Sequence, residues 1–123
     1  MTIFFTSDLH FDTDTFAKNK FRPFNSADEM NLVLLDGINS TVERKDILYI
    51  LGDFARYRAG HFRHLIRCKQ IHFIKGNHDR PADLKFWSSV SDTRIVKLGT
   101  KPNRIPCFLS HYPHIYWPMS HWG

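Results

Sequence analysis

The sequence predicts an α/β fold, a layered sandwich in which mixed β-sheets are flanked by helices. Short apolar runs typical of strands alternate along the chain with segments whose apolar residues recur at helical spacing. One run, "ILYIL" at residues 47–51, is continuously apolar, as expected of a strand that is covered on both faces. The chain has 123 residues, 42% of them hydrophobic and 24% charged, which indicates a single globular domain over residues 1–123.

The first half of the chain predicts two strands and one long helix. The run "TIFF" at residues 2–5 is the first expected strand, and a loop follows through "DTDTFAKNKFRPF". A helix over residues 27–42 is expected to begin at the capping box "SADE", in which Ser26 accepts a hydrogen bond from the helix start and Glu29 reaches back. Apolar residues continue this helix at the required spacing: Met30, Leu34, Ile38 and Val42.

The second half predicts shorter elements. "GHFRHLIRCK" indicates a short helix, and "IHFIKGNHD" begins as a third strand. A short helical segment around residues 84–89 precedes a fourth strand, "RIVKL", and the last clear strand covers residues 106–110.

Charge and composition narrow the function classes. The formal net charge of +5 favours phosphates, nucleotides or nucleic acid as partners, although a basic surface also simply maintains solubility. No apolar run is long enough for a membrane helix, and the N-terminal segment does not resemble a signal peptide, so a cytoplasmic location without membrane contact is expected. Cys68 and Cys107 form no C-x-x-C pair, which predicts free buried thiols and neither a disulfide framework nor a thiolate zinc site.

Polar residues follow the expected strands where each strand ends. Asp8 and His10 come after the first strand, Asp53 after the second, "GNHD" after the third, and His111 after the last. Ligand sites of open α/β sheets lie at the carboxyl ends of strands, so these side chains are expected to converge on one crevice.

The residue types at these strand ends are those of metal ligands. Residues i and i+2 of an extended chain point the same way, so Asp8 and His10 can present an oxygen and a nitrogen to one cation. Gly52 and Gly76 remove side chains beside Asp53 and Asn77, and a carboxylate has two oxygens with which to bridge two ions. A set of Asp, His and Asn without Cys suits manganese, iron, nickel, zinc or magnesium, with manganese the first choice.

The ordered set "SDLH", "LGDF", "GNHD" and "SHYP" resembles the calcineurin-like metallophosphoesterases, particularly the small single-domain bacterial and phage members. "RPF", "ADEMN" and "YILGDF" are similar to the same subgroup. The resemblance covers almost the whole chain. It implies two divalent metal ions, of which Asp8 and His10 hold the first, Asn77 and His111 hold the second, and Asp53 bridges both.

The resemblance also implies an activity. A metal-bridging hydroxide would attack the phosphorus of a phosphomonoester or phosphodiester, with a nucleotide-type substrate as one option and nucleic acid as a weaker one. His78 would donate to the leaving oxygen or to the phosphoryl group, and Asp79 would orient His78. Asn77, Arg80 and His121 are the expected substrate contacts, although Arg80 and His121 could equally be solvated side chains.

One motif of the family is absent from this sequence. Members normally continue to a further strand and a Gly-His-x-His turn that completes both metal shells, and no such turn occurs in the 123 residues. The chain is therefore expected to be C-terminally incomplete, with His114 or His121 as substitute ligands and with an exposed sheet edge that self-association could cover. The alternative to an enzyme is a metal-binding or nucleotide-binding protein of the same fold without turnover.

The sequence lacks the motifs of several other classes of enzyme. It contains no G-x-S-x-G nucleophile elbow, no G-x-x-x-x-G-K-[ST] phosphate loop and no Rossmann glycine pattern. Serine hydrolases, P-loop kinases and dehydrogenases are therefore disfavoured.

Overall fold

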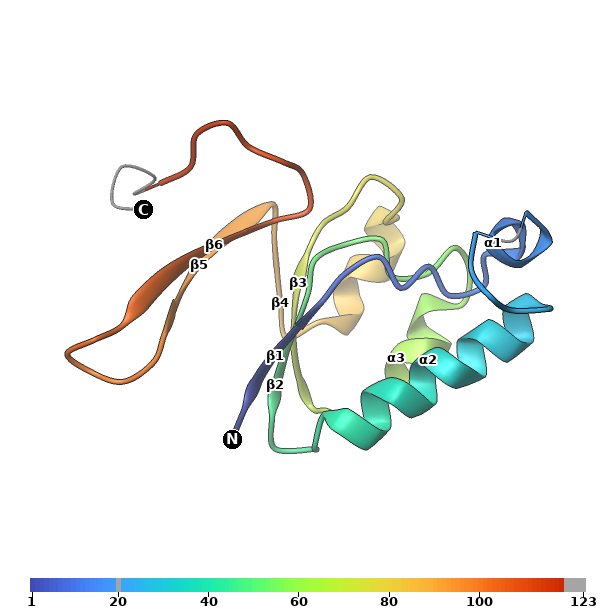
Figure 1. Ribbon diagram of the computed structural model, residues 1–123, viewed down its shortest axis with the longest axis horizontal. Coiled ribbons are helices and arrows are strands. Elements are labelled where there is room, and N and C mark those ends of the chain that lie inside the picture. Colours follow the sequence, from blue (N-terminus) through green and yellow to red (C-terminus); the bar gives the residue numbers. More distant parts are fainter. Residues whose placement is uncertain (20, 119–123) are drawn as a thin grey trace.

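A four-stranded parallel sheet forms the centre of the molecule in the computed structural model, which describes residues 1–19 and 21–118 (Figure 1). Its strands lie in the order β1 (Ile3–Thr6), β2 (Ile47–Ile50), β3 (Gln70–Ile74) and β4 (Ser89–Ser91). A separate antiparallel hairpin consists of β5 (Thr93–Leu98) and β6 (Ile105–Ser110). Parallel and antiparallel sheets thus occur together, as the sequence predicts.

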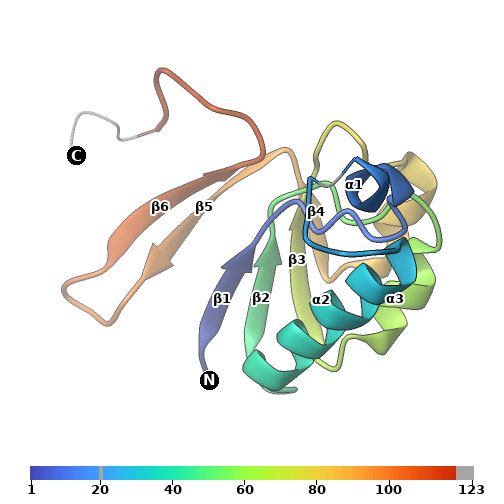
Figure 2. The same ribbon diagram turned by 45° about the vertical axis from the view of Figure 1, so that its right-hand side comes forward.

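The helices and the hairpin lie on opposite sides of the parallel sheet (Figures 1 and 2). The helical elements are α1 (Asp14–Lys18), α2 (Ala27–Thr41), α3 (Ala59–Leu65) and the 3₁₀ helix η1 (Pro81–Phe86). This arrangement confirms the predicted layered α/β fold. No helix in the described part of the chain is long and apolar enough to cross a membrane.

The alternation of side chains along β2 explains its continuously apolar sequence. Leu48 and Ile50 point into the core under the helices, which also contains Phe11 and Phe62. The rings of these two phenylalanines are stacked, with centroids 4.5 Å apart. Tyr49 points the other way, into a smaller cluster with Ile74, Val96 and Leu109 that joins the sheet to the hairpin. Both faces of β2 are therefore covered, as expected of a central parallel strand.

Local sequence signals fix most element boundaries. The predicted helix cap is present at the start of α2: the Ser26 hydroxyl accepts from the Glu29 backbone N–H at 3.1 Å, and the Glu29 carboxylate accepts from the Asn25 N–H at 3.0 Å. Two elements differ from the prediction. The short helix α1 lies in a predicted loop, and β4 was not predicted, because its three residues form a strand only through pairing with β3.

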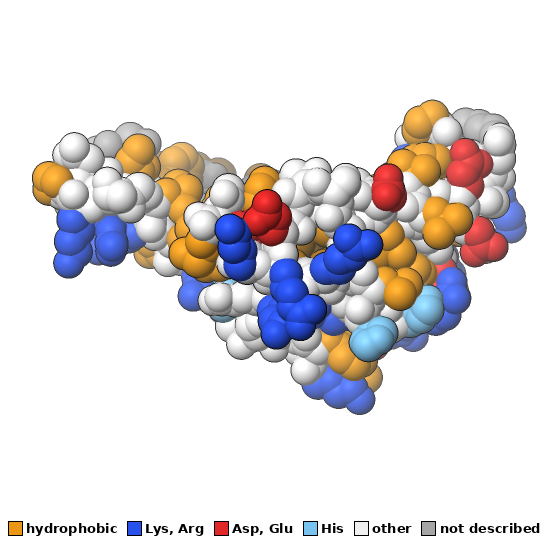
Figure 3. All heavy atoms as spheres, turned by 90° about the horizontal axis from the view of Figure 1, so that it is seen from below, with side chains coloured by type: hydrophobic (Ala, Val, Ile, Leu, Met, Phe, Trp, Pro, Cys, Tyr) orange, Lys and Arg blue, Asp and Glu red, His pale blue; other side chains and the backbone are white. Residues whose placement is uncertain are grey.

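The arginine-rich segment at residues 56–67 does not form one continuous basic surface. The Arg63 guanidinium donates to the backbone carbonyls of Ile66, Cys68, Lys69 and Phe86, and thereby satisfies acceptors after the end of α3. Arg67 lies at the amino-terminal end of the sheet, where it lines a groove of about 630 Å³ with Arg44 and Lys69. Figure 3 views the molecule from this end and shows Lys and Arg side chains gathered over it. A nucleic-acid partner stays a prediction.

Asp46, at the amino-terminal end of the sheet, is expected to make the free energy of unfolding depend on pH. Its buried carboxylate accepts from the backbone N–H groups of Thr2 and Glu43, both at 2.8 Å, and these bonds lower its pKa. A lowered folded-state pKa contributes stability above the unfolded value of about 3.9, and this contribution is lost as the pH falls through the folded-state pKa.

We expect Asp46→Asn to reduce the free energy of unfolding at pH 7, because its amide NH₂ would face a backbone donor. The difference from wild type should narrow as the pH falls from 5 toward 3, in urea unfolding curves recorded across that range. A difference that stays constant with pH would contradict this role for the carboxylate.

Candidate metal centre

Two loops at the carboxyl end of the sheet present Asp8, His10 and Asp53. The loops run side by side, because the N–H of Asp8 donates to Gly52 O at 3.1 Å and that of His10 to Asp53 O at 3.0 Å. All three residues have left-handed backbone conformations, with φ of 54°, 53° and 53°. Such conformations cost about 1–3 kcal/mol each outside glycine and cluster at functional sites, where the surroundings hold them in place.

The first group of ligand atoms comes from these three residues. Nε2 of His10 lies 3.5 Å from Oδ1 of Asp8 and 3.5 Å from Oδ2 of Asp53. One ligand atom from each residue can be chosen so that all lie within 4.8 Å of one another. Burial lowers the pKa of His10 below its usual 6.5, against the opposing effect of the two carboxylates, and so favours the neutral ring that a metal ligand requires.

The second group shares Asp53 and adds Asn77 and His111. Nε2 of His111 lies 3.0 Å from Oδ1 of Asn77 and 3.5 Å from Oδ2 of Asp53. Its Nδ1 lies 2.7 Å from the carbonyl oxygen of Leu51, which can only accept, so Nδ1–H donates to this carbonyl and Nε2 is the ring nitrogen that faces Asn77 and Asp53. Oδ2 of Asp53 is thus 3.5 Å from Nε2 of both histidines.

Glycines allow the loops to approach so closely. A Cβ added to Gly52 would lie 2.6 Å from Nδ1 of His111 and 2.7 Å from Cα of Gly76. A Cβ on Gly76 would lie 2.7 Å from the backbone N of Asp53. Gly52 also has φ of +85°, a conformation that side chains disfavour.

Asp79 holds these loops together through their backbones. Its carboxylate accepts from the N–H groups of Asp53 at 2.8 Å, Phe54 at 3.1 Å and Gly76 at 2.7 Å. Within the described residues, this carboxylate therefore accepts hydrogen bonds from backbone N–H groups, and it has no hydrogen bond to the ring of His78. Asp79 is placed to position the loop that carries Asp53, whereas its expected effect on His78 stays a prediction.

Two further positioning contacts were not expected from the sequence. The Arg22 guanidinium donates to the carbonyls of Asp8 at 2.6 Å and Leu9 at 2.7 Å. The amide of buried Asn31 exchanges two hydrogen bonds with Asp12, at 3.0 and 2.9 Å, and so ties α2 to the first loop. The quoted motifs "RPF" and "ADEMN" contain both residues, yet nothing in their spacing assigns these contacts.

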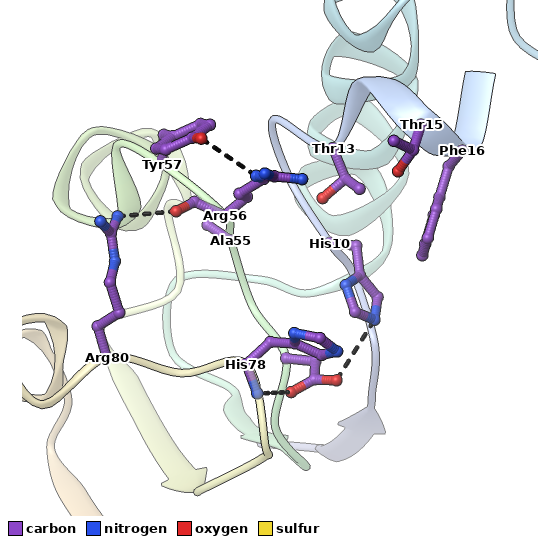
Figure 4. Close-up of a pocket in the computed structure, with 10 residues that line it drawn as sticks. His10, Thr13, Thr15, Phe16, Ala55, Arg56, Tyr57, His78 and Arg80 are labelled. Atoms are coloured by element: carbon purple, nitrogen blue, oxygen red, sulfur yellow. Dashed lines mark hydrogen bonds and ion pairs between the residues drawn. The ribbon is translucent and has the colours of Figure 1, made fainter. Parts of the chain in front are cut away.

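His78 and Arg80 line a cavity of about 380 Å³ beside the ligand atoms (Figure 4). The His78 ring lies 5.7 Å from that of His10, and its backbone N–H donates to Oδ1 of Asp53 at 2.9 Å. Arg80 donates to the carbonyl of Arg56 at 2.7 Å and lies 3.4 Å from Asp83. The structure thus brings His78 to the predicted crevice and places Arg80 on its wall.

His114, one of the two expected substitute ligands, lies apart from this group. His114 contacts β6, with its Nε2 2.9 Å from the Ser110 hydroxyl and its ring against Phe108. His121, the expected substrate contact, lies outside the described residues.

The donor set fits divalent cations. Carboxylate oxygens, imidazole nitrogens and an amide oxygen suit borderline-hard metals, and the two groups share one carboxylate. Asp8, His10 and Asp53 could hold one ion, and Asp53, Asn77 and His111 a second. Both cysteines are free thiols, with Cys68 buried and Cys107 half-buried.

Comparison with known proteins identifies the family of the chain. A family model for the calcineurin-like phosphoesterases matches residues 1–118. An uncharacterized protein of Methanocaldococcus jannaschii is 39% identical over 82 residues, which are 63% of this chain and 47% of the relative. The crystal structure of a protein of unknown function from Aquifex aeolicus superposes with a TM-score of 0.70 and 26% identity, over 92% of this chain and 62% of that one.

The chain spans about half the length of the curated relative and less than two thirds of the structural neighbour. The family match nevertheless covers nearly all of the sequence, including every strand end that carries a candidate ligand. The chain therefore belongs to the calcineurin-like phosphoesterase family.

Proposed function

We propose that the protein is a metal-dependent phosphoesterase that hydrolyses a phosphomonoester or phosphodiester. The observation that carries this proposal is the position of the Asp53 carboxylate, with Oδ2 3.5 Å from Nε2 of both His10 and His111. A carboxylate with one ligand group on either side is what a two-metal site requires. Manganese is the proposed metal.

The residues of the site would have three roles: metal binding, proton donation and positioning of the loops. Asp8, His10, Asp53, Asn77 and His111 would hold two divalent ions, which when bound polarise a phosphoryl oxygen and lower the pKa of a water molecule. His78 lines the cavity next to these ligands, where its imidazole can donate a proton to the leaving oxygen. Asp79 fixes the relative positions of the loops, so that little reorganisation is needed when the substrate binds.

The first test is hydrolysis of p-nitrophenyl phosphate and bis(p-nitrophenyl) phosphate, by protein loaded with Mn²⁺ and by the same protein stripped with a chelator. We expect turnover only in the loaded protein, together with a rise in melting temperature on adding the metal, since a ligand of the folded state stabilises it. A rise in melting temperature without turnover would replace the enzyme with a binding protein of the same fold.

His78→Gln tests the proton donor separately. Because Gln cannot donate a labile proton, we expect kcat to fall by about 100-fold, while the metal-induced rise in melting temperature is retained. The fall should be smaller for bis(p-nitrophenyl) phosphate than for an alkyl phosphate ester, whose leaving oxygen needs the proton more. An equal fall for both esters would argue that His78 binds the phosphoryl group and does not protonate the leaving group.

A further inference from the structure

The cavity beside the metal-binding residues has room for much more than a phosphoryl group. Its volume is about 380 Å³, within the range of small-molecule sites. Beyond His10, Asp53 and His78, its walls come from Thr13, Thr15 and Phe16 near the start of α1, from residues 55–57 after β2, and from Arg80. The cavity therefore extends away from the metal-binding residues, where the part of an ester that leaves with the alcohol oxygen would lie.

The charged side chains in this extension are both arginines. Asp53 is the sole carboxylate among the described lining residues, and it lies at the metal-binding end. Arg80 is partly neutralised, because its Nε lies 3.4 Å from Asp83. Arg56 has no carboxylate within ion-pair distance in the described part of the chain, and its Nε donates to the Tyr57 hydroxyl at 3.2 Å. Its two terminal nitrogens are thus available to an anion.

The backbone of Arg56 is held on both sides. Its N–H donates to Phe11 O at 2.8 Å, and its carbonyl accepts from the Arg80 guanidinium at 2.7 Å. Figure 4 shows the Arg56 side chain extending from the wall that carries Tyr57 toward Thr13 on the opposite wall. Its planar guanidinium presents the two terminal nitrogens as a fork, which matches the oxygens of a carboxylate or a phosphate and limits the entropy lost per hydrogen bond.

We infer that Arg56 binds a second anionic group on the leaving portion of the substrate, so that the substrate class is phosphate esters with a further phosphate or carboxylate. This inference rests on the proposed function for the position of the scissile phosphate. The ring of Phe16, which lines the same cavity, would pack against the body of the leaving group between its two charged ends.

A binding experiment tests this subsite without requiring turnover. Calorimetry would compare phenylphosphonate with (4-carboxyphenyl)phosphonate, which differ by one carboxylate and are not hydrolysed, on Mn²⁺-loaded protein. We expect the carboxylate to improve affinity by about tenfold in the wild type, as a charge-assisted hydrogen bond does. Arg56→Gln should abolish this preference, and Arg56→Lys should retain part of it.

Arg67→Gln is the matched control, because this exposed arginine lies at the opposite end of the sheet and its recorded hydrogen bond uses only its backbone. It should keep the full preference. The inference is overturned if the wild type shows no preference or binds neither phosphonate, if the preference survives Arg56→Gln, or if Arg67→Gln loses it equally. A failure of the proposed function can be told apart from a failure of this inference. In that case ester hydrolysis would be absent, but the preference for the carboxylated phosphonate would persist.

Discussion

Asp53→Asn is expected to abolish Mn²⁺-dependent ester hydrolysis, with kcat/KM falling by at least about 1000-fold. The reason is the shared position of this carboxylate: one substitution removes an anionic ligand from both groups of donor atoms at once. Asn can keep the hydrogen bond that the N–H of His78 donates to Oδ1, so the loop should stay in place. The variant should therefore be folded without metal but fail to gain stability when Mn²⁺ is added.

Asp92→Asn provides a control with the same chemical change. Asp92 is exposed and pairs with Lys75 at 3.1 Å, it supplies no atom to either group of donor atoms, and exposed pairs contribute little. Melting curves with and without Mn²⁺, together with hydrolysis rates, should match wild type in this variant. If Asp53→Asn retained the metal-induced stabilisation, the assignment of Asp53 as the shared ligand would be wrong.

Gly76→Ala is expected to lower the free energy of unfolding by about 1–3 kcal/mol and to weaken metal binding. The added Cβ would lie 2.7 Å from the backbone N of Asp53 and closer still to its Oδ1, so the two loops must separate. Separation strains the hydrogen bonds that Asp79 makes to both loops, at 2.8 Å to Asp53 N and 2.7 Å to Gly76 N.

The same substitution at Gly37 should have the opposite effect. Gly37 lies within α2, and its added Cβ would meet no atom within 4 Å. Gly37→Ala should therefore raise stability by about 0.5–1 kcal/mol, because alanine favours the helix. Urea unfolding of both variants measures the contrast. If Gly76→Ala raised the free energy of unfolding as Gly37→Ala does, the contact between the added Cβ and Asp53 would not be destabilising, and this prediction would be wrong.

The parts of the fold that the sequence predicts are those with local physical causes. The long helix follows from the cap at Ser26 and the spacing of its apolar residues, and the buried strand at residues 47–50 from its continuously apolar run. The strand β4 could not be predicted, since three residues of ordinary composition become a strand only beside β3. The helix α1 has five residues and no recurring apolar pattern.

The candidate site likewise contains residues that the sequence predicts and contacts that it does not. The rule that ligands lie at the carboxyl ends of parallel strands accounts for Asp8, His10 and Asp53. His111 reaches the same point by a different route, because it follows a strand of the antiparallel hairpin. Contacts to backbone carbonyls and amides, such as those of Arg22 and Asp79, depend on how loops fold in space, and residue type alone does not reveal them.

The position of His111 on the hairpin makes metal binding and the docking of the two sheets one coupled equilibrium. A small cluster of apolar side chains, including Val96 and Leu109, joins the hairpin to the parallel sheet, and His111 reaches across to Leu51 and Asn77. An ion held by Asn77 and His111 would link the two layers, and by thermodynamic reciprocity a well-docked hairpin would bind that ion more tightly. Amide hydrogen exchange in β5 and β6 should then slow as the second ion binds, so that the hairpin itself reports the occupancy of the site.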